Sequence, residues 1–335
     1  MITDFIQKMI ERVDLTEAEA RQAMEEIMSG QSTDAQIAGF LTALRMKGET
    51  SQELVGFAGV MRERAEPLWD GEVLPVLDTA GTGGVRLGTF NISTAAAFVA
   101  AAAGVRVAKH GNRSATSRCG SADVMEALGL DIQMPVERLR RAIKDTRIGF
   151  LFAQRFHTSM KHVMAARMQL KVRTVFNILG PLANPAGARF QVVGVSAPEI
   201  MELMANALNG LNTDHAFVVH GANGMDEVSI SSRTHVVEMR RGEMRQFVIS
   251  PEDFGMTSAR IETILGGDAL ENARIIESVF GGEPGPRRDV VLLNSAPAIV
   301  AGGAAKTWKE GLQLAAEAID SGAALRKLKE LREFN

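Results

Sequence analysis

The chain has 335 residues, 46% of them hydrophobic and 23% charged, which is the composition of a folded globular protein of about two domains. Its 37 lysines and arginines against 40 aspartates and glutamates give a net charge of −3 at pH 7, so a general surface for nucleic acid is not expected. The longest apolar run, residues 95–105, falls far short of the roughly 20 residues that cross a bilayer, so no membrane span is expected.

The N-terminal residues mix both charge signs in an amphipathic pattern and lack the apolar run of a secretion signal. Cys119 is the only cysteine, so an intrachain disulfide is impossible, and no Cys/His cluster has the spacing of a zinc site. We therefore expect a cytoplasmic protein without a structural metal.

Signals for helix starts dominate residues 1–70. Three threonines are each followed, three positions later, by a Glu or Gln that can complete a capping box, in which side chains satisfy free N–H groups of the first turn. These pairs are Thr16 with Glu19, Thr33 with Gln36, and Thr50 with Glu53. We predict a small all-helical N-terminal domain of about four helices over residues 1–70, joined by part of 160–190. Short helices are not stable alone, and their surplus apolar surface favours a homodimer through this domain.

From residue 73 onward, short apolar runs alternate with helical stretches. The runs cover residues 73–79, 105–108, 148–153, 191–195 and 216–220. Such alternation predicts a larger α/β domain over residues 71–335, with a mostly parallel sheet flanked by helices and a helical tail from residue 258. Ligands of such sheets bind beyond the carboxyl ends of the strands, where the polar loops of this chain fall.

The first of these loops, DTAGTGGVRLGTFNIST at residues 78–94, runs from a strand end through several glycines to a helix start. Glycines let backbone N–H groups approach an anion, and the helix N-terminus adds its positive dipole end, so a phosphate group is the expected ligand. A dinucleotide fingerprint would need glycine in place of Arg86, and a P-loop would need lysine in place of Thr89. Neither an NAD enzyme nor a standard ATPase is indicated.

Three further segments complete a candidate site. KHGNRSATS at residues 109–117 supplies a lysine and an arginine after the next strand, so the two loops together predict one ligand with two phosphate groups. Asp226 and Glu227 follow a later strand and suit Mg²⁺ beside such a ligand. Arg167 lies in an apolar helical stretch, where a guanidinium can bind a carboxylate.

These segments, together with GSAD at 120–123, FNILGPLANP at 176–185, MDE at 225–227 and PEDFG at 251–255, resemble the anthranilate phosphoribosyltransferase family of tryptophan biosynthesis. The motifs occur in that family's order and spacing across nearly the whole chain. The resemblance implies Mg²⁺-dependent transfer of phosphoribose from phosphoribosyl pyrophosphate (PRPP) to the amine of anthranilate. It also implies a homodimer whose helical domain is joined by a hinge to the α/β domain.

The resemblance further implies the roles of individual residues, with no covalent nucleophile among them. Those implied to bind PRPP are Gly81, Gly84, Val85, Thr89, Asn91, Ile92, Ser93, Thr94, Lys109, His110, Gly111, Asn112, Arg113, Ser114, Ala115, Thr116, Ser117 and Ser121. Those implied to bind anthranilate or to line its route are Gly81, Asn112, Arg167, His110, His157 and Pro181. Ser93, Asp226 and Glu227 are implied to hold two Mg²⁺ ions per subunit.

One departure from the family pattern stands at Val85 and Arg86, where the family reads Asp-Gly. The exchange raises the local charge by two units beside the expected pyrophosphate, so we expect altered handling of PRPP and Mg²⁺. Two alternatives remain open. A pyrimidine nucleoside phosphorylase-like enzyme would be longer and would lack this KHGNR loop. The other is a paralogue that lost the transferase activity and binds nucleic acid; the net charge of −3 and the presence of Asn112 and Arg167 argue against it.

Overall fold

The computed structural model describes residues 1–84, 87–114 and 118–334 of the chain. Its N-terminal quarter forms α1 (Ile2–Ile10), α2 (Glu17–Met28), α3 (Asp34–Lys47) and α4 (Ser51–Glu63). All three predicted capping boxes are confirmed: each threonine hydroxyl accepts from the backbone N–H three residues on, and that residue's side chain accepts from the threonine N–H. Four short helices are therefore started by local contacts that the sequence makes visible.

The sheet has seven strands in the order β3-β2-β1-β4-β5-β6-β7. They are β1 (Leu77–Gly81), β2 (Val107–Gly111), β3 (Ile148–Phe152), β4 (Phe190–Gly194), β5 (His215–Gly221), β6 (Thr234–Arg240) and β7 (Glu243–Ile249). The first five are parallel, so the five predicted strands and the mostly parallel sheet are confirmed, although β1 starts at Leu77 rather than at residue 73.

The antiparallel hairpin of β6 and β7 at the sheet edge is absent from the sequence-based prediction. Its turn is Arg241-Gly242, with φ values of 51° and 87°, instead of the more recognisable Asn-Gly pair. Most of β7 is exposed, so it also lacks the apolar alternation of a half-buried strand. Both local signals that identify hairpins are therefore weak here.

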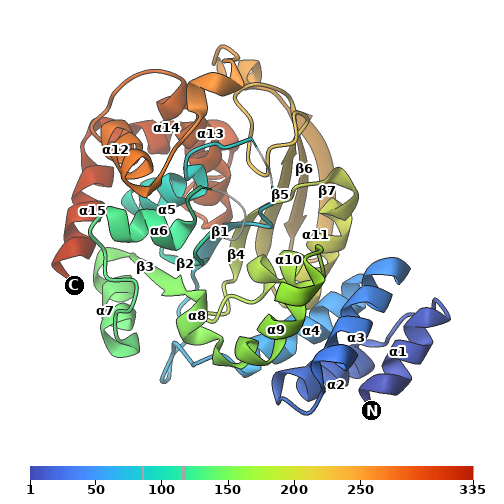
Figure 1. Cartoon of the computed structure of the whole chain (residues 1–335). Coiled ribbons are helices and arrows are strands. Elements are labelled where there is room, and N and C mark those ends of the chain that lie inside the picture. The colour runs from blue at the N-terminus through green and yellow to red at the C-terminus, as the bar shows by residue number, and fades with distance from the viewer. Residues whose placement is uncertain (85–86, 115–117, 335) are drawn as a thin grey trace.

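Helices cover both faces of the sheet (Figure 1). One face carries α5 (Ile92–Ala102), α6 (Ser121–Ala127), α7 (Val136–Thr146), α12 (Ala269–Phe280), α13 (Pro286–Ala301), α14 (Trp308–Asp320) and α15 (Ala323–Glu333). The other face carries α4 and α11 (Met201–Gly210). Consecutive strand residues point to opposite faces: Val192 and Phe217 belong to the first core, Val193 and Val218 to the second.

Between β3 and β4 the chain leaves the sheet and joins the N-terminal helices. After α8 (Ala153–Phe156), α9 (Lys161–Leu170) packs on α2 and α3, and α10 (Phe176–Leu179) packs on α4 (Figure 1). The segment then returns through residues 180–185 to β4. Among the described helices, none is both long and apolar enough to cross a membrane.

Candidate active site

The glycine-rich loop and the KHGNR loop leave the carboxyl ends of β1 and β2, which are neighbours in the sheet. Gly83 and Gly84 have φ values of 64° and 82°, which side-chain-bearing residues rarely adopt, so glycine is required in this tight turn. The Gly83 N–H donates to Asp226 Oδ2 at 3.2 Å, which ties the turn to the loop after β5. Val85, expected here to bind PRPP, lies outside the described residues.

The far end of the same loop leads into α5. Thr89 pairs with Leu265 in an isolated bridge, and Asn91, Ile92, Ser93 and Thr94 form the start of the helix. Asn91 Oδ1 accepts from the buried Asn272 side chain at 2.9 Å, while its amide donates to the Cys119 carbonyl at 3.4 Å. The predicted combination of a glycine turn and a helix N-terminus is therefore present in the structure.

Lys109 lies between the two loops and is buried. Its Nζ donates to the Thr79 carbonyl, to Thr79 Oγ1 at 3.3 Å and to Ser93 Oγ at 3.4 Å. Burial lowers the Lys109 pKa to about 8, and the neighbouring Asp78 and Glu227 carboxylates oppose that shift. Lys109 thus brings a positive charge from β2 to the end of β1 and the first turn of α5.

Two buried histidines face each other beside this lysine. The rings of His110 and His157 lie edge to face with centroids 5.1 Å apart, and His110 Nδ1 lies 3.3 Å from the Gly180 carbonyl. Burial lowers the pKa of His110 to about 3 and that of His157 to about 4. Both imidazoles are therefore neutral at physiological pH.

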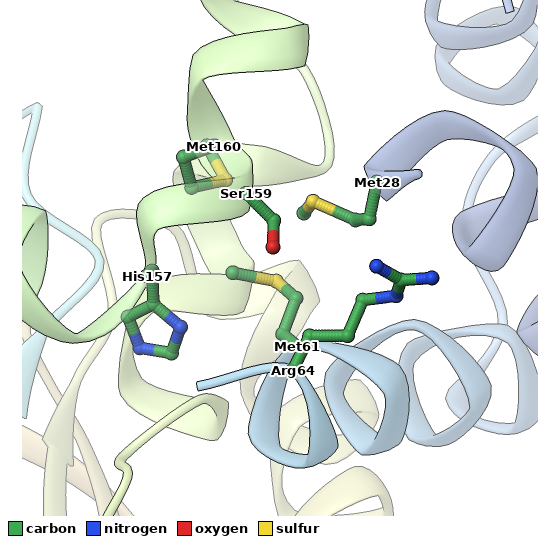
Figure 2. Close-up of a pocket in the computed structure, with 6 residues that line it drawn as sticks. All are labelled: Met28, Met61, Arg64, His157, Ser159 and Met160. Atoms are coloured by element: carbon green, nitrogen blue, oxygen red, sulfur yellow. The ribbon is translucent and has the colours of Figure 1, made fainter. Parts of the chain in front are cut away.

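Figure 2 shows a small cavity beside His157. His157 borders a cavity of about 10 Å³ that is also lined by Met28 of α2, by Met61 and Arg64 at the end of α4, and by Ser159 and Met160 of the 3-10 turn Thr158–Met160. A space of that volume holds no more than about one water molecule. Desolvation therefore disfavours the protonated imidazole, although backbone groups of Ala183 and Met61 oppose the shift.

The rest of the KHGNR loop is shaped by its own contacts. Asn112 is exposed, and its Oδ1 accepts from the Arg113 N–H at 2.8 Å and from Gln154 Nε2 at 3.2 Å. The Arg113 guanidinium forms ion pairs with Asp123 at 3.0 Å and with Glu126 at 2.5 Å. Further backbone contacts link Ser114 to Asp123, Asn112 to Ser121 Oγ at 3.2 Å, and Gly111 to β3. Ala115, Thr116 and Ser117 lie outside the described residues.

Asp226 and Glu227 form the acidic part of the site. Burial raises the pKa of both carboxyls, and for Glu227 the neighbouring negative charge of Asp226 adds to the shift while Lys109 opposes it. A Cβ on Gly81 would lie 2.8 Å from Asp226 Oδ2, so the end of β1 approaches this carboxylate closely. Two adjacent, desolvated carboxylates are hard oxygen ligands that fit a divalent cation such as Mg²⁺, and Lys109 interacts both with Glu227 and with the Ser93 hydroxyl.

Arg167 projects from α9, in the helical layer. Its guanidinium carbon lies 5.3 Å from the centre of the Phe176 ring, and its pKa is lowered by burial alone. Within the described part of the chain it has no salt bridge, so its charge is available to an anionic ligand. The buried Pro181 lies on the neighbouring segment, where its carbonyl accepts from Gln191 Nε2 at 2.8 Å.

Sequence analysis missed three residues that contact these loops. Arg173 Nη2 donates to the Gly83 carbonyl at 3.3 Å and to Ser196 Oγ at 3.0 Å, although it lies in the connection after α9. Asp78 and Asn184 are fully buried between β1 and β2. Asp78 and Asn184 lie inside the motifs at 78–94 and 176–185, but nothing local in either motif shows that the two side chains meet, and Arg173 lies in no motif.

Comparisons with known proteins cover both parts of the chain. Residues 3–65 match the helical bundle domain of a glycosyl transferase family, and residues 74–325 match the a/b domain of a glycosyl transferase family. The chain is 54% identical over 329 residues to an anthranilate phosphoribosyltransferase of Symbiobacterium thermophilum, covering 98% of this chain and 96% of that protein.

Solved structures agree with this similarity. The crystal structure of anthranilate phosphoribosyltransferase from Thermus thermophilus has a TM-score of 0.93 and 44% identity, covering 99% of both chains. The enzyme from Saccharomyces cerevisiae in complex with PRPP and Mg has a TM-score of 0.89 and 28% identity, covering 99% of this chain and 97% of that one.

Proposed function

The chain belongs to the anthranilate phosphoribosyltransferases of the glycosyl transferase family, and from that premise we propose which of its residues bind each substrate and how they promote transfer. It is a pentosyltransferase that moves phosphoribose from PRPP to the amine of anthranilate, with Mg²⁺, in tryptophan biosynthesis. Neither a nucleoside phosphorylase nor a nucleic-acid-binding paralogue gains support from the described residues or from the relatives.

PRPP is placed across the two loops at the ends of β1 and β2. The observation that carries this placement is the meeting of three segments there: the Gly83 turn, the Lys109 ammonium group and the Asp226 loop. The close backbone approach that the glycine turn permits and the positive dipole end of α5 suit phosphate oxygens. The reaction's main demand is stabilising the charge that grows on departing pyrophosphate, and fixed donors and cations meet that demand.

Anthranilate is placed on the side of the helical layer. Arg167 would bind its carboxylate, because that guanidinium carries no salt bridge within the described residues. The neutral faces of His110 and His157, with Pro181, would line the aromatic ring's route, and Gly81 and Asn112 would lie at its inner end. Its neutral aromatic amine needs no strong base, which agrees with histidines whose low pKa values make them weak proton acceptors at neutral pH.

Ser93, Asp226 and Glu227 would hold Mg²⁺, and we propose two ions per subunit. When bound there, the metal supplies charge neutralisation for the pyrophosphate. Removing the Asp226 or the Glu227 carboxylate would relieve the charge repulsion on the other one and would also remove one hard oxygen ligand from the proposed metal site.

We also propose that residues 1–70, with part of 160–190, move as one domain against residues 71–335. Closure would bring Arg167 toward the phosphate loops and exclude water, which otherwise hydrolyses PRPP. Exposed apolar side chains on α1, α3 and α9, with one just after α9, favour a homodimer. They are Ile10, Met46, Met164, Met168 and Val172. The single cysteine, which permits no intrachain disulfide, supports action in the cytoplasm.

The test is loss of anthranilate fluorescence after addition of PRPP and Mg²⁺. We expect loss that requires metal and that Arg167→Ala severely weakens. Unchanged turnover in Arg167→Ala would refute the acceptor placement, whereas turnover without any divalent cation would refute the metal site.

A further inference from the structure

The main-chain ladder between β1 and β2 is interrupted where the phosphate loops begin. β1 pairs with β4 at all five of its residues, and β2 pairs with β3 at all five of its residues. Along these described strands, β1 and β2 share a single pair, Leu77 with Val107. Beyond Leu77 the two strands separate, and their inward-facing backbone groups need other partners.

Two buried side chains supply those partners. The His110 N–H donates to Asp78 Oδ1 at 3.1 Å. Asn184 Nδ2 donates both to the Ala108 carbonyl, at 2.8 Å, and to Asp78 Oδ2, at 2.7 Å. Asp78 and Asn184 are 0% exposed, so bulk solvent does not reach either side chain. A bridge made of one carboxylate and one amide thus replaces the missing ladder.

The direction of each hydrogen bond in this bridge is fixed by backbone groups. Asn184 Oδ1 accepts from the Ala186 N–H at 2.8 Å, while its Nδ2 faces the Ala108 carbonyl. A backbone N–H can only donate and a carbonyl can only accept, so the amide cannot turn over. Asp78 must therefore accept at both oxygens, which only a carboxylate does. An asparagine at this position would set one NH₂ group against another.

The bridge touches both substrate-binding regions. Asp78 opens the glycine-rich segment, and His110 belongs to the KHGNR loop. Asn184 follows Pro181 on the segment that leaves the helical layer, where the Leu182 carbonyl accepts from Arg62 Nε of α4 at 2.7 Å. Asp78 also contributes a negative charge beside Lys109. The buried pair of Asp78 and Asn184 is therefore connected to both phosphate loops and to the segment around Pro181 that is proposed to line the anthranilate route.

We propose that Asp78 and Asn184 are a positioning pair for the transfer reaction, holding β1 and β2 apart so that donor and acceptor meet in line. This inference rests on the substrate placement proposed above. Small displacements of reacting groups have large kinetic effects, because a shift of about 1 Å can cost on the order of 100-fold in rate. Loss of the pair should accordingly impair transfer more than it impairs folding.

The experiment compares Asp78→Asn, Asn184→Asp and the double exchange with a matched control, Glu53→Gln. Glu53 is likewise 0% exposed, it lies in α4 of the N-terminal helical layer, and it accepts from the N–H groups of Leu15 at 2.9 Å and Thr50 at 2.8 Å and from Lys47 Nζ at 3.1 Å. For each variant, kcat, both KM values, the thermal midpoint and the ratio of PRPP consumed to product formed are measured. A merely structural role would leave that ratio unchanged.

We expect Asp78→Asn to lower kcat about tenfold or more and to raise the share of PRPP lost to hydrolysis. Glu53→Gln should lower the thermal midpoint comparably while keeping kcat within about twofold. The double exchange should recover part of the loss seen in Asn184→Asp. In it, the amide introduced at position 78 would donate to the carboxylate introduced at position 184, which leaves only the Ala108 carbonyl unmet.

Wild-type kcat and an unchanged PRPP ratio in Asp78→Asn would overturn the proposal. If Asp78→Asn does not fold, the double exchange decides: recovered folding and transfer support the pair, and transfer no better than in Asn184→Asp overturns it. Failure of the wild-type protein to transfer phosphoribose would instead refute the substrate placement, so the two failures are distinguishable.

Discussion

Acid should destabilise this protein through the two neutral histidines of the site, and His157→Gln isolates that effect. Burial lowers the His157 pKa to about 4 from an ordinary value of about 6.5. Between these two values the unfolded chain binds a proton that the folded protein rejects. Stability from this residue is therefore complete above pH 6.5 and is lost progressively as the pH falls toward 4.

The size of the effect follows from the shift. At pH 5 the unfolded His157 is largely protonated and the folded one largely neutral, which costs about 2 kcal/mol of unfolding free energy relative to pH 7.5. His110, with a pKa of about 3, contributes a similar loss of about 2 kcal/mol. For a chain of this length, about 2 kcal/mol corresponds to roughly 3 °C in the thermal midpoint.

Other buried groups act in the opposite direction. Burial raises the pKa of Asp78 to about 6, so the folded protein gains a proton there before the unfolded chain does, which favours folding as the pH falls toward 4. The pKa values of Asp226 and Glu227 are also raised, so these two groups likewise favour folding as the pH falls. The comparison of wild type with His157→Gln removes these contributions, because they occur in both proteins.

The assay is the thermal midpoint of both proteins at pH 7.5 and pH 5. We expect the thermal midpoint of wild type, measured relative to that of His157→Gln, to be lower by roughly 3 °C at pH 5 than at pH 7.5. His235→Gln is the control, because the His235 side chain is exposed on β6. The thermal midpoint of this variant should change between pH 7.5 and pH 5 by the same amount as that of wild type. An equal shift in wild type and His157→Gln would refute the conclusion that His157 is held neutral by burial.

Four further outcomes test the proposed placement of substrates and subunits. Arg167→Ala should raise the KM for anthranilate about tenfold to 100-fold, through loss of a charged hydrogen bond, with the KM for PRPP changed far less. Gly84→Ala should weaken PRPP binding in calorimetry by about 1–3 kcal/mol, because φ is +82° there and a Cβ would meet the Arg173 guanidinium; undiminished binding would count against the glycine turn. Replacing Val85 and Arg86 with Asp-Gly should change the dependence on Mg²⁺ and PRPP, and identical kinetics would contradict the expected charge effect. Met168→Arg should give monomers in light scattering, whereas an intact dimer would place the interface elsewhere.

Sequence patterns predicted those parts of the molecule whose physical causes are local. A capping box is closed within four residues, so Thr16, Thr33 and Thr50 identify their helices without knowledge of the fold. The glycine turn is similar, because Gly83 and Gly84 are required by their own backbone angles. Adjacency of the two loops also followed from parallel-sheet topology, since consecutive strand ends lie at one edge.

The buried polar contacts could not be predicted in the same way. Asp78 and Asn184 are separated by 106 positions, and only the folded chain shows that each satisfies the other. Arg173 is separated from Gly83 by 90 positions and lies in a connection with no periodic pattern. For such residues the sequence shows a polar side chain but not its distant partner, and polar side chains are ordinarily solvated.

Lys109 illustrates how the structure refines a role that the residue type suggests. The sequence indicates a cation for phosphate, yet the structure directs its ammonium group at Thr79 and Ser93 and buries it. An ammonium group has three N–H donors, and three oxygens already accept from them. A phosphate oxygen would have to replace one of these contacts. The positive charge of Lys109 has an effect without any change of hydrogen-bond partner, because it interacts with Asp78 and Glu227 in the protein interior, where charges are weakly screened. Lys109 thus stabilises the charges of Asp78 and Glu227, which belong to the proposed positioning pair and to the proposed metal site.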